Sequence, residues 1–575
     1  MANEAYLALQ NSTALYGIAT ENEHGYPITL TEEMVGNIAK AFCVWLISHT
    51  GKVRVSVAVG YDSRTSSPLL CEAAVNGILS TGHDAVVTDI STTPSMLALL
   101  TDEVWQERYP SDGSMMVTAG QLPAEYNGLK LFFRENSLSA ADVSSILAIA
   151  NTYRYAKPYE DGNRTKASYL DRYAQRLVNT VRAATDEETP LLNKKIIVDA
   201  GNGVGGFFVE KVLKPLGANT VGSQALEPNG CFPYAANSTA IEALQATVKE
   251  VGAELGILFD ADASCAYAVD HEGGVFGGNR LIALLSASFL TEGQCTVVTD
   301  PLTSNGLTQF IEARGGVHQR YIRGMKNLID AAVRSNAFDE YTPLVAETNG
   351  RAALLKNRFA EDGAYLAAYL LITLVKAGKQ GQRLAELVAD LQESKEAMAV
   401  QIPLLDYENA RLNGGRLLNG FCHHAYITPY ITAEENNYDG YRVNYDEKHG
   451  DGWALLCTEP NAPTLSLYLE SDREHGALKI AKDVYYFLRK SPCVDVAPLQ
   501  AAIEAERKRL IANIRKDFYT DAAYLTFIFG EKVIVQKEEL ETPVSQSAET
   551  ELIDETAILN ETEQTPSNAT AEENA

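Results

Sequence analysis

Several features that mark large classes of proteins are missing from this sequence. The eight cysteines form no CxxC pair and show no other spacing that is typical of a metal site. Scattered cysteines of this kind are usual in a reducing compartment, so we expect a cytoplasmic protein. Residues 1–9 also lack the basic and then apolar pattern of a signal peptide. The longest apolar run, residues 364–375, is too short to span a bilayer and predicts a buried helix.

Positive charge is scarce. The chain has 48 Lys and Arg residues against 75 Asp and Glu residues, and its formal net charge is −27. Nucleic-acid sites and anionic membrane surfaces both attract clustered Lys and Arg, so the composition argues against partners of either kind. After Lys537 there is no Lys or Arg, and eleven acidic residues follow. We therefore expect residues 538–575 to form a disordered, solvating acidic tail, with a partner-binding segment at residues 552–559 as the alternative.

Short apolar runs alternate with helix-length amphipathic segments through most of the chain. This alternation is typical of βα units packed as mainly parallel sheets, so the predicted class is α/β. Strands are expected at residues 53–59, 85–89, 115–118, 195–199, 255–259, 295–299 and 344–347. Helices are expected at residues 68–79, 205–216, 281–290, 307–313, 326–333 and 363–376. Strand-like runs at 441–445, 453–457 and 464–470, with a helix at 477–488, predict a smaller α+β domain at the end.

At 575 residues the chain is too long for one hydrophobic core. We expect three successive βα domains at residues 1–190, 191–300 and 301–417. The smaller domain is expected at 418–495, a helix with one more strand pair (524–536) at 496–537, and the acidic tail at 538–575.

One stretch carries most of the information about function. It reads Thr-Ala-Gly-Gln-Leu-Pro at residues 118–123, and Asn-Gly-Leu-Lys follows at residues 127–130. The stretch resembles the catalytic loop of the α-D-phosphohexomutases (phosphoglucomutase/phosphomannomutase), which reads Thr-Ala-Ser-His-Asn-Pro and then Asn-Gly-x-Lys. In that family the serine carries the phosphoryl group and the lysine is a proposed acid/base. Gly120 stands at the serine and Lys130 at the lysine, so the resemblance implies a catalytic loop without its nucleophile.

The resemblance extends in order over residues 6–490 and implies four domains around a central cleft. Residues 59–68 keep the family's turn between a strand and a helix. Arg64 in this turn is expected either to orient the catalytic loop or to form a structural salt bridge. The family's N-terminal arginine falls on Tyr16, which carries no fixed charge.

The family's metal loop, Asp-x-Asp-x-Asp-Arg, falls on residues 260–265. Three carboxylates there would hold Mg²⁺, a cation that prefers oxygen ligands. Two remain, Asp260 and Asp262, while Ser264 is a weaker neutral ligand. The residues predict weak Mg²⁺ binding at most. The alternative is that the two acidic residues only cap a turn at the end of a strand.

The loops expected to bind substrate are altered as well. The family's sugar loop reads Glu-x-Ser-Gly-His, and residues 347–351 of this chain read Glu-Thr-Asn-Gly-Arg. The candidate sugar ligands are therefore Glu347, Asn349 and Arg351. Lys326 lies in a second loop that resembles one facing the sugar. Glu347 is expected either to contact the sugar or to have a structural role.

The phosphate-binding loop of the last domain loses its arginine in either alignment, which places Cys457 or Ala454 at that position. Four cooperating loops therefore differ while the scaffold is kept. The prediction is a phosphoglucomutase/phosphomannomutase-like pseudoenzyme of carbohydrate metabolism, inactive or impaired, that binds hexose phosphate or acts in regulation. It could form oligomers with itself or with an active relative. The alternative is an active isomerase with altered chemistry that interconverts hexose 1- and 6-phosphates.

Overall fold

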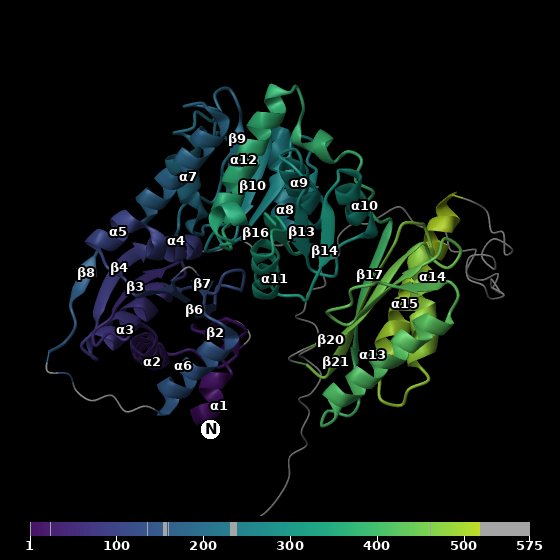
Figure 1. Ribbon diagram of the computed structural model, residues 1–575, viewed down its shortest axis with the longest axis horizontal. Helices are drawn as coiled ribbons and strands as arrows, with labels where there is room; N and C mark the ends of the chain where they lie inside the picture. Colours follow the sequence, from purple (N-terminus) through teal and green to yellow (C-terminus); the bar gives the residue numbers. More distant parts are fainter. Residues whose placement is uncertain are drawn as a thin grey trace, which may run out of the picture. The chain divides into compact units, whose positions relative to one another are not determined.

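The structure, a computed structural model, describes residues 2–22, 25–134, 136–152, 158, 160–230, 238–459 and 462–517. The chain divides into two compact units, residues 1–507 and 508–575. Four β-sheets with their own helices make up the described part of the first unit (Figure 1). The strand pair predicted at 524–536 and the tail predicted at 538–575 fall outside the described residues.

The first sheet is mixed, with the strand order β1-β2-β6-β5-β3-β4-β8 and with β7 beside β6. Strands β5, β3, β4 and β8 are parallel, whereas β2 and β6 run antiparallel to their neighbours. The strands are β1 (Gln10–Asn11), β2 (Ala14–Ile18), β3 (Ser56–Tyr61), β4 (Asp84–Ile90), β5 (Gly113–Val117), β6 (Tyr126–Phe133), β7 (Asn136–Ser137) and β8 (Arg164–Lys166).

Alternate side chains of this sheet enter two different cores, as the two-residue period of a strand requires. Val57 and Val59 of β3 join the core formed with α2, α3 and α6, whereas Ala58 between them joins the core that contains α4 and α7. Both faces of the sheet are therefore covered. The helices of this domain are α1 (Ala2–Leu7), α2 (Glu32–Thr50), α3 (Ser67–Leu79), α4 (Thr93–Ala98), α5 (Glu103–Arg108), α6 (Ala140–Thr152) and α7 (Leu170–Thr185).

The second and third sheets have four strands each, in the orders β12-β11-β10-β9 and β14-β13-β15-β16. The strands are β9 (Ile196–Asp199), β10 (Leu255–Phe259), β11 (Ala266–Asp270), β12 (Val275–Phe276), β13 (Thr296–Thr299), β14 (Val317–Arg320), β15 (Leu344–Ala346) and β16 (Ala352–Leu354). The helices are α8 (Ser238–Val251), α9 (Gly278–Leu290), α10 (Asn305–Ala313), α11 (Met325–Ala337) and α12 (Gly363–Lys379), with shorter turns η2 (Val204–Gly206), η3 (Val209–Leu213) and η5 (Leu384–Val388).

Helix α12 is the element predicted from the apolar run at residues 364–375. Asp362 caps its first turn by accepting the backbone N–H of Tyr365 at 2.8 Å. Nearly all of its side chains are buried in a core shared by the second and third sheets, so the prediction of a buried helix is confirmed. Within the described part of the chain, none of the helices combines the length and apolar composition that crossing a bilayer requires.

The fourth sheet is antiparallel, in the order β17-β21-β20-β19-β18. Its strands are β17 (Glu396–Pro403), β18 (Ile431–Ala433), β19 (Tyr441–Tyr445), β20 (Gly452–Thr458) and β21 (Thr464–Ser471), and its helices are α13 (Ala410–Ile427), α14 (Gly476–Leu488) and α15 (Ala497–Asp517). The side chains of Trp453 and Leu455 on β20 pack against Leu302 of the third domain.

Two domain boundaries differ from those placed on the sequence. Strand β13 pairs with β14 and β15 of the third sheet, so a boundary at residue 300 falls after the first strand of the third domain. Strand β17 pairs with β21 of the fourth sheet, so a boundary at residue 418 is too late. In both cases strand pairing, which depends on contacts distant in sequence, decides the membership of the segment.

Candidate active site

The loop between β5 and β6 carries the motif that resembles a catalytic loop. The side chain of Arg64 is fully buried and holds this loop by hydrogen bonds to the backbone carbonyls of the loop. Its Nη2 donates to the carbonyls of Gly120 and Leu122, both at 2.8 Å, and its Nη1 donates to the carbonyls of Pro123 and Tyr126. The planar fork of the guanidinium suits such multiple acceptors. Arg64 therefore fixes the path of the loop.

Asp62 is the charged partner of Arg64. Its Oδ2 atom lies 3.1 Å from Arg64 Nε and accepts a hydrogen bond from Thr118 Oγ1 at 2.7 Å, while Ser67 Oγ donates to Oδ1 at 2.6 Å. Burial raises the pKa of Asp62, and Arg64 opposes that shift. Arg64 thus has both of the roles that the sequence left open, because one side chain orients the loop and forms the salt bridge.

Gly120 lies in this loop with φ at +57°, in the left-handed region that favours glycine. A Cβ atom placed on it would lie 3.8 Å from Lys130 Nζ and 3.9 Å from Asp262 Oδ2. Its N–H donates to Thr118 Oγ1 at 3.0 Å, which fixes the orientation of the peptide. A side chain at this position would point at a charged pair, but glycine supplies no oxygen.

That pair joins the first and second domains. Lys130 Nζ lies 2.7 Å from Asp262 Oδ2, and the same oxygen accepts hydrogen bonds from Thr93 Oγ1 at 2.6 Å and from Thr118 Oγ1 at 3.2 Å. Burial lowers the pKa of Lys130 and raises that of Asp262. Their mutual attraction outweighs burial, so the pKa of Lys130 is raised and that of Asp262 is lowered. Both groups remain charged and neutralise each other.

Asp260 lies beside this pair, directly after β10. Ser264 Oγ donates to it at 2.9 Å and the N–H of Cys265 donates at 3.0 Å. Burial, and then the charge of Asp262, raise the pKa of Asp260 to about 7. Among the residues that the structure describes, no group of three or more His, Cys, Asp or Glu side chains could hold a metal ion. With Asp262 neutralised by Lys130, these residues do not fit the three-carboxylate Mg²⁺ site that the resemblance implies.

A cavity of 80 Å³ lies next to Lys130 and is lined by all three βα domains. Tyr16 lies on β2, opposite Gly128 of β6, and reaches the cavity from the first domain. Burial raises the pKa of its phenol, and the nearby charge of Lys130 opposes this shift. Ser264 reaches the cavity from the second domain and Arg351 from the third.

Arg351 is the candidate ligand whose side chain reaches this cavity from the sugar loop. Its Nη1 atom is 3.7 Å from Glu361 Oε2, and its side chain is 41% exposed. Burial lowers the pKa of Arg351, but Glu361 together with Cys265, Glu347 and Tyr16 outweighs this effect and the pKa is raised. Arg351 is therefore a permanent cation at the wall of the cavity.

Glu347 and Asn349 hold the sugar loop together instead of lining the cavity. Glu347 is buried and accepts from the N–H of Gly324 at 2.9 Å and from Asn349 Nδ2 at 3.0 Å. The Oδ1 atom of Asn349 accepts the N–H of Arg351 at 3.0 Å. From the sequence, Glu347 is expected either to contact the sugar or to have a structural role, and these contacts favour the structural role.

Lys326 does not join the other candidates. It pairs with Asp330 one turn further along α11 and is not among the residues lining the cavity. Its neighbour Arg323 instead contacts the fourth domain, with Nε 2.6 Å from Asp439 Oδ2 and Nη1 3.0 Å from Glu459 Oε1. Glu459, in the loop expected to bind phosphate, thus pairs with a cation of the protein.

Three residues at the site were not identified from the sequence. Thr93 bonds Asp262 from the start of α4, Glu361 pairs with Arg351, and the hydroxyl of Tyr267 accepts from Gln121 and donates to the carbonyl of Asn349, both at 3.3 Å. Their only local signal is position: Thr93 follows the capping residue of α4, and Glu361 precedes that of α12. Their contacts depend on how the domains pack.

Comparisons with known proteins agree with this architecture. Sequence profiles of phosphoglucomutase/phosphomannomutase, alpha/beta/alpha domains I, II and III, match residues 16–157, 168–274 and 277–394. A phosphoglucomutase/phosphomannomutase of Thermococcus kodakarensis is 26% identical over 476 residues, which cover 80% of this chain and 94% of the relative. A phosphoglucosamine mutase of Lactobacillus delbrueckii subsp. bulgaricus is 27% identical over 361 residues, 61% of this chain and 75% of the relative.

Among solved structures, a phosphoglucomutase/phosphomannomutase family protein from Burkholderia thailandensis has the same fold, with a TM-score of 0.69 at 21% identity. The match covers 85% of this chain and 97% of that one. The profiles of domains I, II and III match this chain one after another and together span most of residues 16–394. The chain belongs to the phosphoglucomutase/phosphomannomutase family, the α-D-phosphohexomutases.

Proposed function

We propose that this protein binds a hexose phosphate but does not transfer its phosphoryl group, and that it acts by binding or regulation in carbohydrate metabolism. The observation that carries the proposal is Gly120. Its backbone aims a side-chain position at Lys130 and Asp262, yet it has no oxygen to carry a phosphate. Phosphoryl transfer by this family's mechanism needs that oxygen.

Neighbouring hydroxyls are poorly placed to replace it. Thr118 is fully buried and its Oγ1 already contacts Asp62, Asp262 and the N–H of Gly120. Ser264 donates a hydrogen bond to Asp260 and lies in the loop after β10, not in the loop that carries Gly120. Because in-line transfer tolerates little displacement of the reacting atoms, neither hydroxyl is a good substitute nucleophile.

The charges at the site also argue against phosphoryl transfer. Phosphoryl transfer depends on cations that neutralise the charge developing on the phosphate. Lys130 is paired with Asp262, and Arg323 is paired with Asp439 and Glu459. Arg351 keeps its charge at the cavity wall, so it supports ligand binding better than catalysis.

The ligand class follows from the relatives. They are named phosphoglucomutase/phosphomannomutase and phosphoglucosamine mutase, whose names share a hexose phosphate. A phosphate oxygen near Arg351 and a sugar hydroxyl near Tyr16 would use two of the polar groups that line the cavity.

The test is a mutase assay with glucose 1-phosphate and mannose 1-phosphate, Mg²⁺ and the matching 1,6-bisphosphate. Lys130→Ala controls for contaminating host enzyme, and titration calorimetry measures hexose-phosphate binding in parallel. We expect no turnover above the control, and binding that is weakened about tenfold in Arg351→Ala, as loss of a charge-assisted contact predicts. Turnover that Lys130→Ala abolishes would instead establish the alternative, an active mutase with altered chemistry. Absence of any hexose-phosphate binding would contradict the binding role.

A regulatory role through a partner has its own test. Recovery of the chain from its native cell together with a second protein, an active relative included, would support it. Recovery as a lone monomer would count against it.

A further inference from the structure

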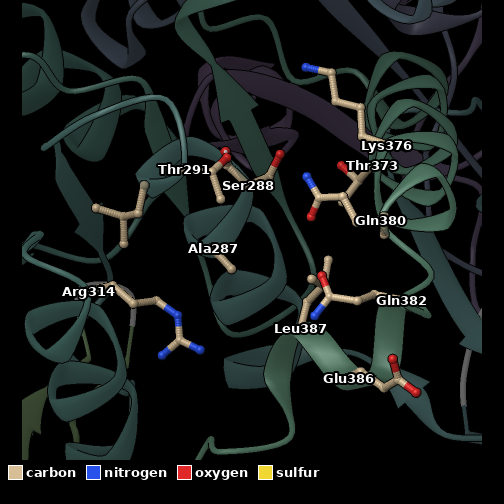
Figure 2. Close-up of a pocket in the computed structure, with 12 residues that line it drawn as sticks. Ala287, Ser288, Thr291, Arg314, Thr373, Lys376, Gln380, Gln382, Glu386 and Leu387 are labelled. Atoms are coloured by element: carbon tan, nitrogen blue, oxygen red, sulfur yellow. The ribbon is translucent and has the colours of Figure 1, made fainter.

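A second cavity lies in the third domain and shares no lining residue with the candidate active site (Figure 2). Its volume is 360 Å³, within the range of small-molecule sites. The walls come from α9, α12, the turn after α12 and η5, with one residue from the end of α10. Two glutamines that follow α12, Gln380 and Gln382, are among the residues that line it.

Three helices end at this cavity. Thr291, Arg314 and Gln380 are the C-terminal capping residues of α9, α10 and α12, and all three line it. The last carbonyls of a helix lack partners within the helix, and its C-terminus carries a partial negative charge. The cavity therefore favours hydrogen-bond donors and disfavours anions.

Each charged side chain of the cavity has a hydrogen-bond or ion-pair partner. Arg314 pairs with both carboxylate oxygens of Asp390, at 2.8 and 3.0 Å, and Lys376 Nζ lies 3.6 Å from Glu292 Oε1. The carboxylate of Glu386 accepts the N–H of Arg383 at 3.1 Å. A phosphate beside Arg314 or Lys376 would also meet the carboxylates of Asp390 and Glu292, and Glu386 adds a third on the cavity wall, so a neutral ligand suits this cavity better.

Neutral polar groups remain available. The hydroxyls of Thr291 and Thr373 donate to the carbonyls of Ser288 and Tyr369 at 2.7 and 3.0 Å, so their oxygens can still accept. Figure 2 shows the polar atoms of Ser288, Thr291, Thr373 and Gln380 on facing walls of the same space. Gln380 adds an amide that can both donate and accept.

Aliphatic side chains lie among these polar groups. Ala287, Leu290, Ala377 and Leu387 all line the cavity. Hydroxyl and amide groups mixed with an aliphatic surface match a ring that carries many hydroxyls on a hydrocarbon frame.

We propose that this cavity binds a neutral, polyhydroxylated ligand of hexose size, at a site separate from the candidate active site. Helix α12 separates the two. It begins directly after Asp362, next to Glu361 of the active-site cavity, and ends at the second cavity. At 17 residues it is about 25 Å long. The two sites can therefore be tested independently.

The experiment is saturation-transfer NMR and calorimetry on the full chain, with D-glucose as the neutral probe and glucose 6-phosphate as its charged counterpart. The test variant is Gln380→Ala combined with Gln382→Ala, two exposed changes that circular dichroism can verify as folded. Loss of the hydrogen bonds of two amides is expected to weaken D-glucose binding about tenfold. Arg351→Ala, in the other cavity, serves as the matched control and is expected to leave D-glucose binding unchanged.

Three results would overturn the proposal. The first is no saturable binding of D-glucose, D-mannose or N-acetylglucosamine. The second is D-glucose binding that is lost in Arg351→Ala and kept in the glutamine variant, which would place the sugar in the active-site cavity. The third is glucose 6-phosphate binding that the glutamine variant weakens more than it weakens D-glucose binding, which would contradict the charge argument. None of these depends on whether hexose phosphate binds beside Arg351.

Discussion

At the scale of single residues, the candidate site keeps its supports and lacks its reactive atom. Arg64 still binds four carbonyls of the loop, and Lys130 still meets Asp262. Gly120 between them has a left-handed φ that suits glycine. The backbone conformation at Gly120 therefore disfavours a side chain, although a side chain there would point toward Lys130 and Asp262.

Placing a serine at Gly120 tests whether the missing hydroxyl alone accounts for the proposed lack of turnover. A non-glycine residue in the left-handed region costs about 1–2 kcal/mol, so Gly120→Ser is expected to lower the free energy of unfolding in urea by about that amount. We expect no mutase turnover, because a third carboxylate and the phosphate-loop arginine are still missing. Gly120→Ala is the matched control, since it has the same backbone cost without a hydroxyl. Turnover in the serine variant alone would show that the other changes are compatible with catalysis.

Arg64 is predicted to be among the most important residues for stability in the first domain. Arg64→Ala leaves Asp62 and four carbonyls without their buried donor, so urea unfolding should show a loss of about 3–5 kcal/mol. Arg64→Lys should recover little, because an ammonium lacks the planar fork. The control is Arg54→Ala, which breaks the largely exposed pair with Asp84 and should cost about 1 kcal/mol or less. Similar losses in Arg64→Ala and Arg54→Ala would contradict this account.

The sequence identified the residues of the site that lie in recognisable loops. Lys130, Asp260, Asp262 and Arg351 are each marked by a motif, and the structure brings all four near one cavity. It could not show that Lys130 pairs with Asp262, because that contact joins two domains and depends on packing. For the same reason Thr93 and Tyr267 carry no local signal of their role.

At the scale of elements, buried strands were the easiest to predict. The strand expected at 255–259 is β10, Leu255–Phe259, because a short, fully buried strand reads as a continuous apolar run. The helix expected at 205–216 is present but irregular: it begins with the 3₁₀ turn Val204–Gly206 and continues into the π-helix Val209–Leu213. A Cβ on Gly205 would lie 2.6 Å from Phe259, so close packing of the backbone against β10 accompanies the irregular start.

Strand β14 carries a pH-dependent contribution to stability. The ring of His318 is half-buried and lies between Thr299 and Thr308, each 2.8 Å from one of its nitrogens. Burial, with the nearby charges of Arg320 and Arg442, lowers its pKa well below 6.5. The unfolded chain therefore takes up a proton near pH 6.5 that the folded protein does not bind.

The stabilising contribution of neutral His318 is complete above about pH 6.5 and falls by up to about 1.4 kcal/mol per pH unit below it. Urea unfolding between pH 8 and pH 5 should therefore show a smaller loss of stability in His318→Gln than in the unmodified protein. His423→Gln, at an exposed position of α13, is the control and should keep the original slope. An unchanged slope in His318→Gln would show that other groups cause the pH dependence.

At the scale of the whole molecule, the domains meet through the groups that a ligand would otherwise bind. Lys130, Thr93 and Thr118 of the first domain all contact Asp262 of the second. Arg323 of the third domain pairs with two carboxylates of the fourth. Charges that could serve a phosphate or a metal ion thus serve contacts between domains.

The Lys130–Asp262 pair allows a quantitative test of this idea. Lys130→Met and Asp262→Asn each leave one charge without its partner, and with Lys130 18% exposed we expect each to cost about 3 kcal/mol in urea unfolding. The double variant removes both charges, so its loss should be smaller than the sum, with a coupling of about 1–3 kcal/mol. The matched cycle on Arg164 and Glu72, an exposed pair at 2.8 Å, should give a coupling of about 0.5 kcal/mol or less. If the losses at Lys130 and Asp262 simply add, the pair does not hold the two domains together, and its charges would be free to serve a ligand instead.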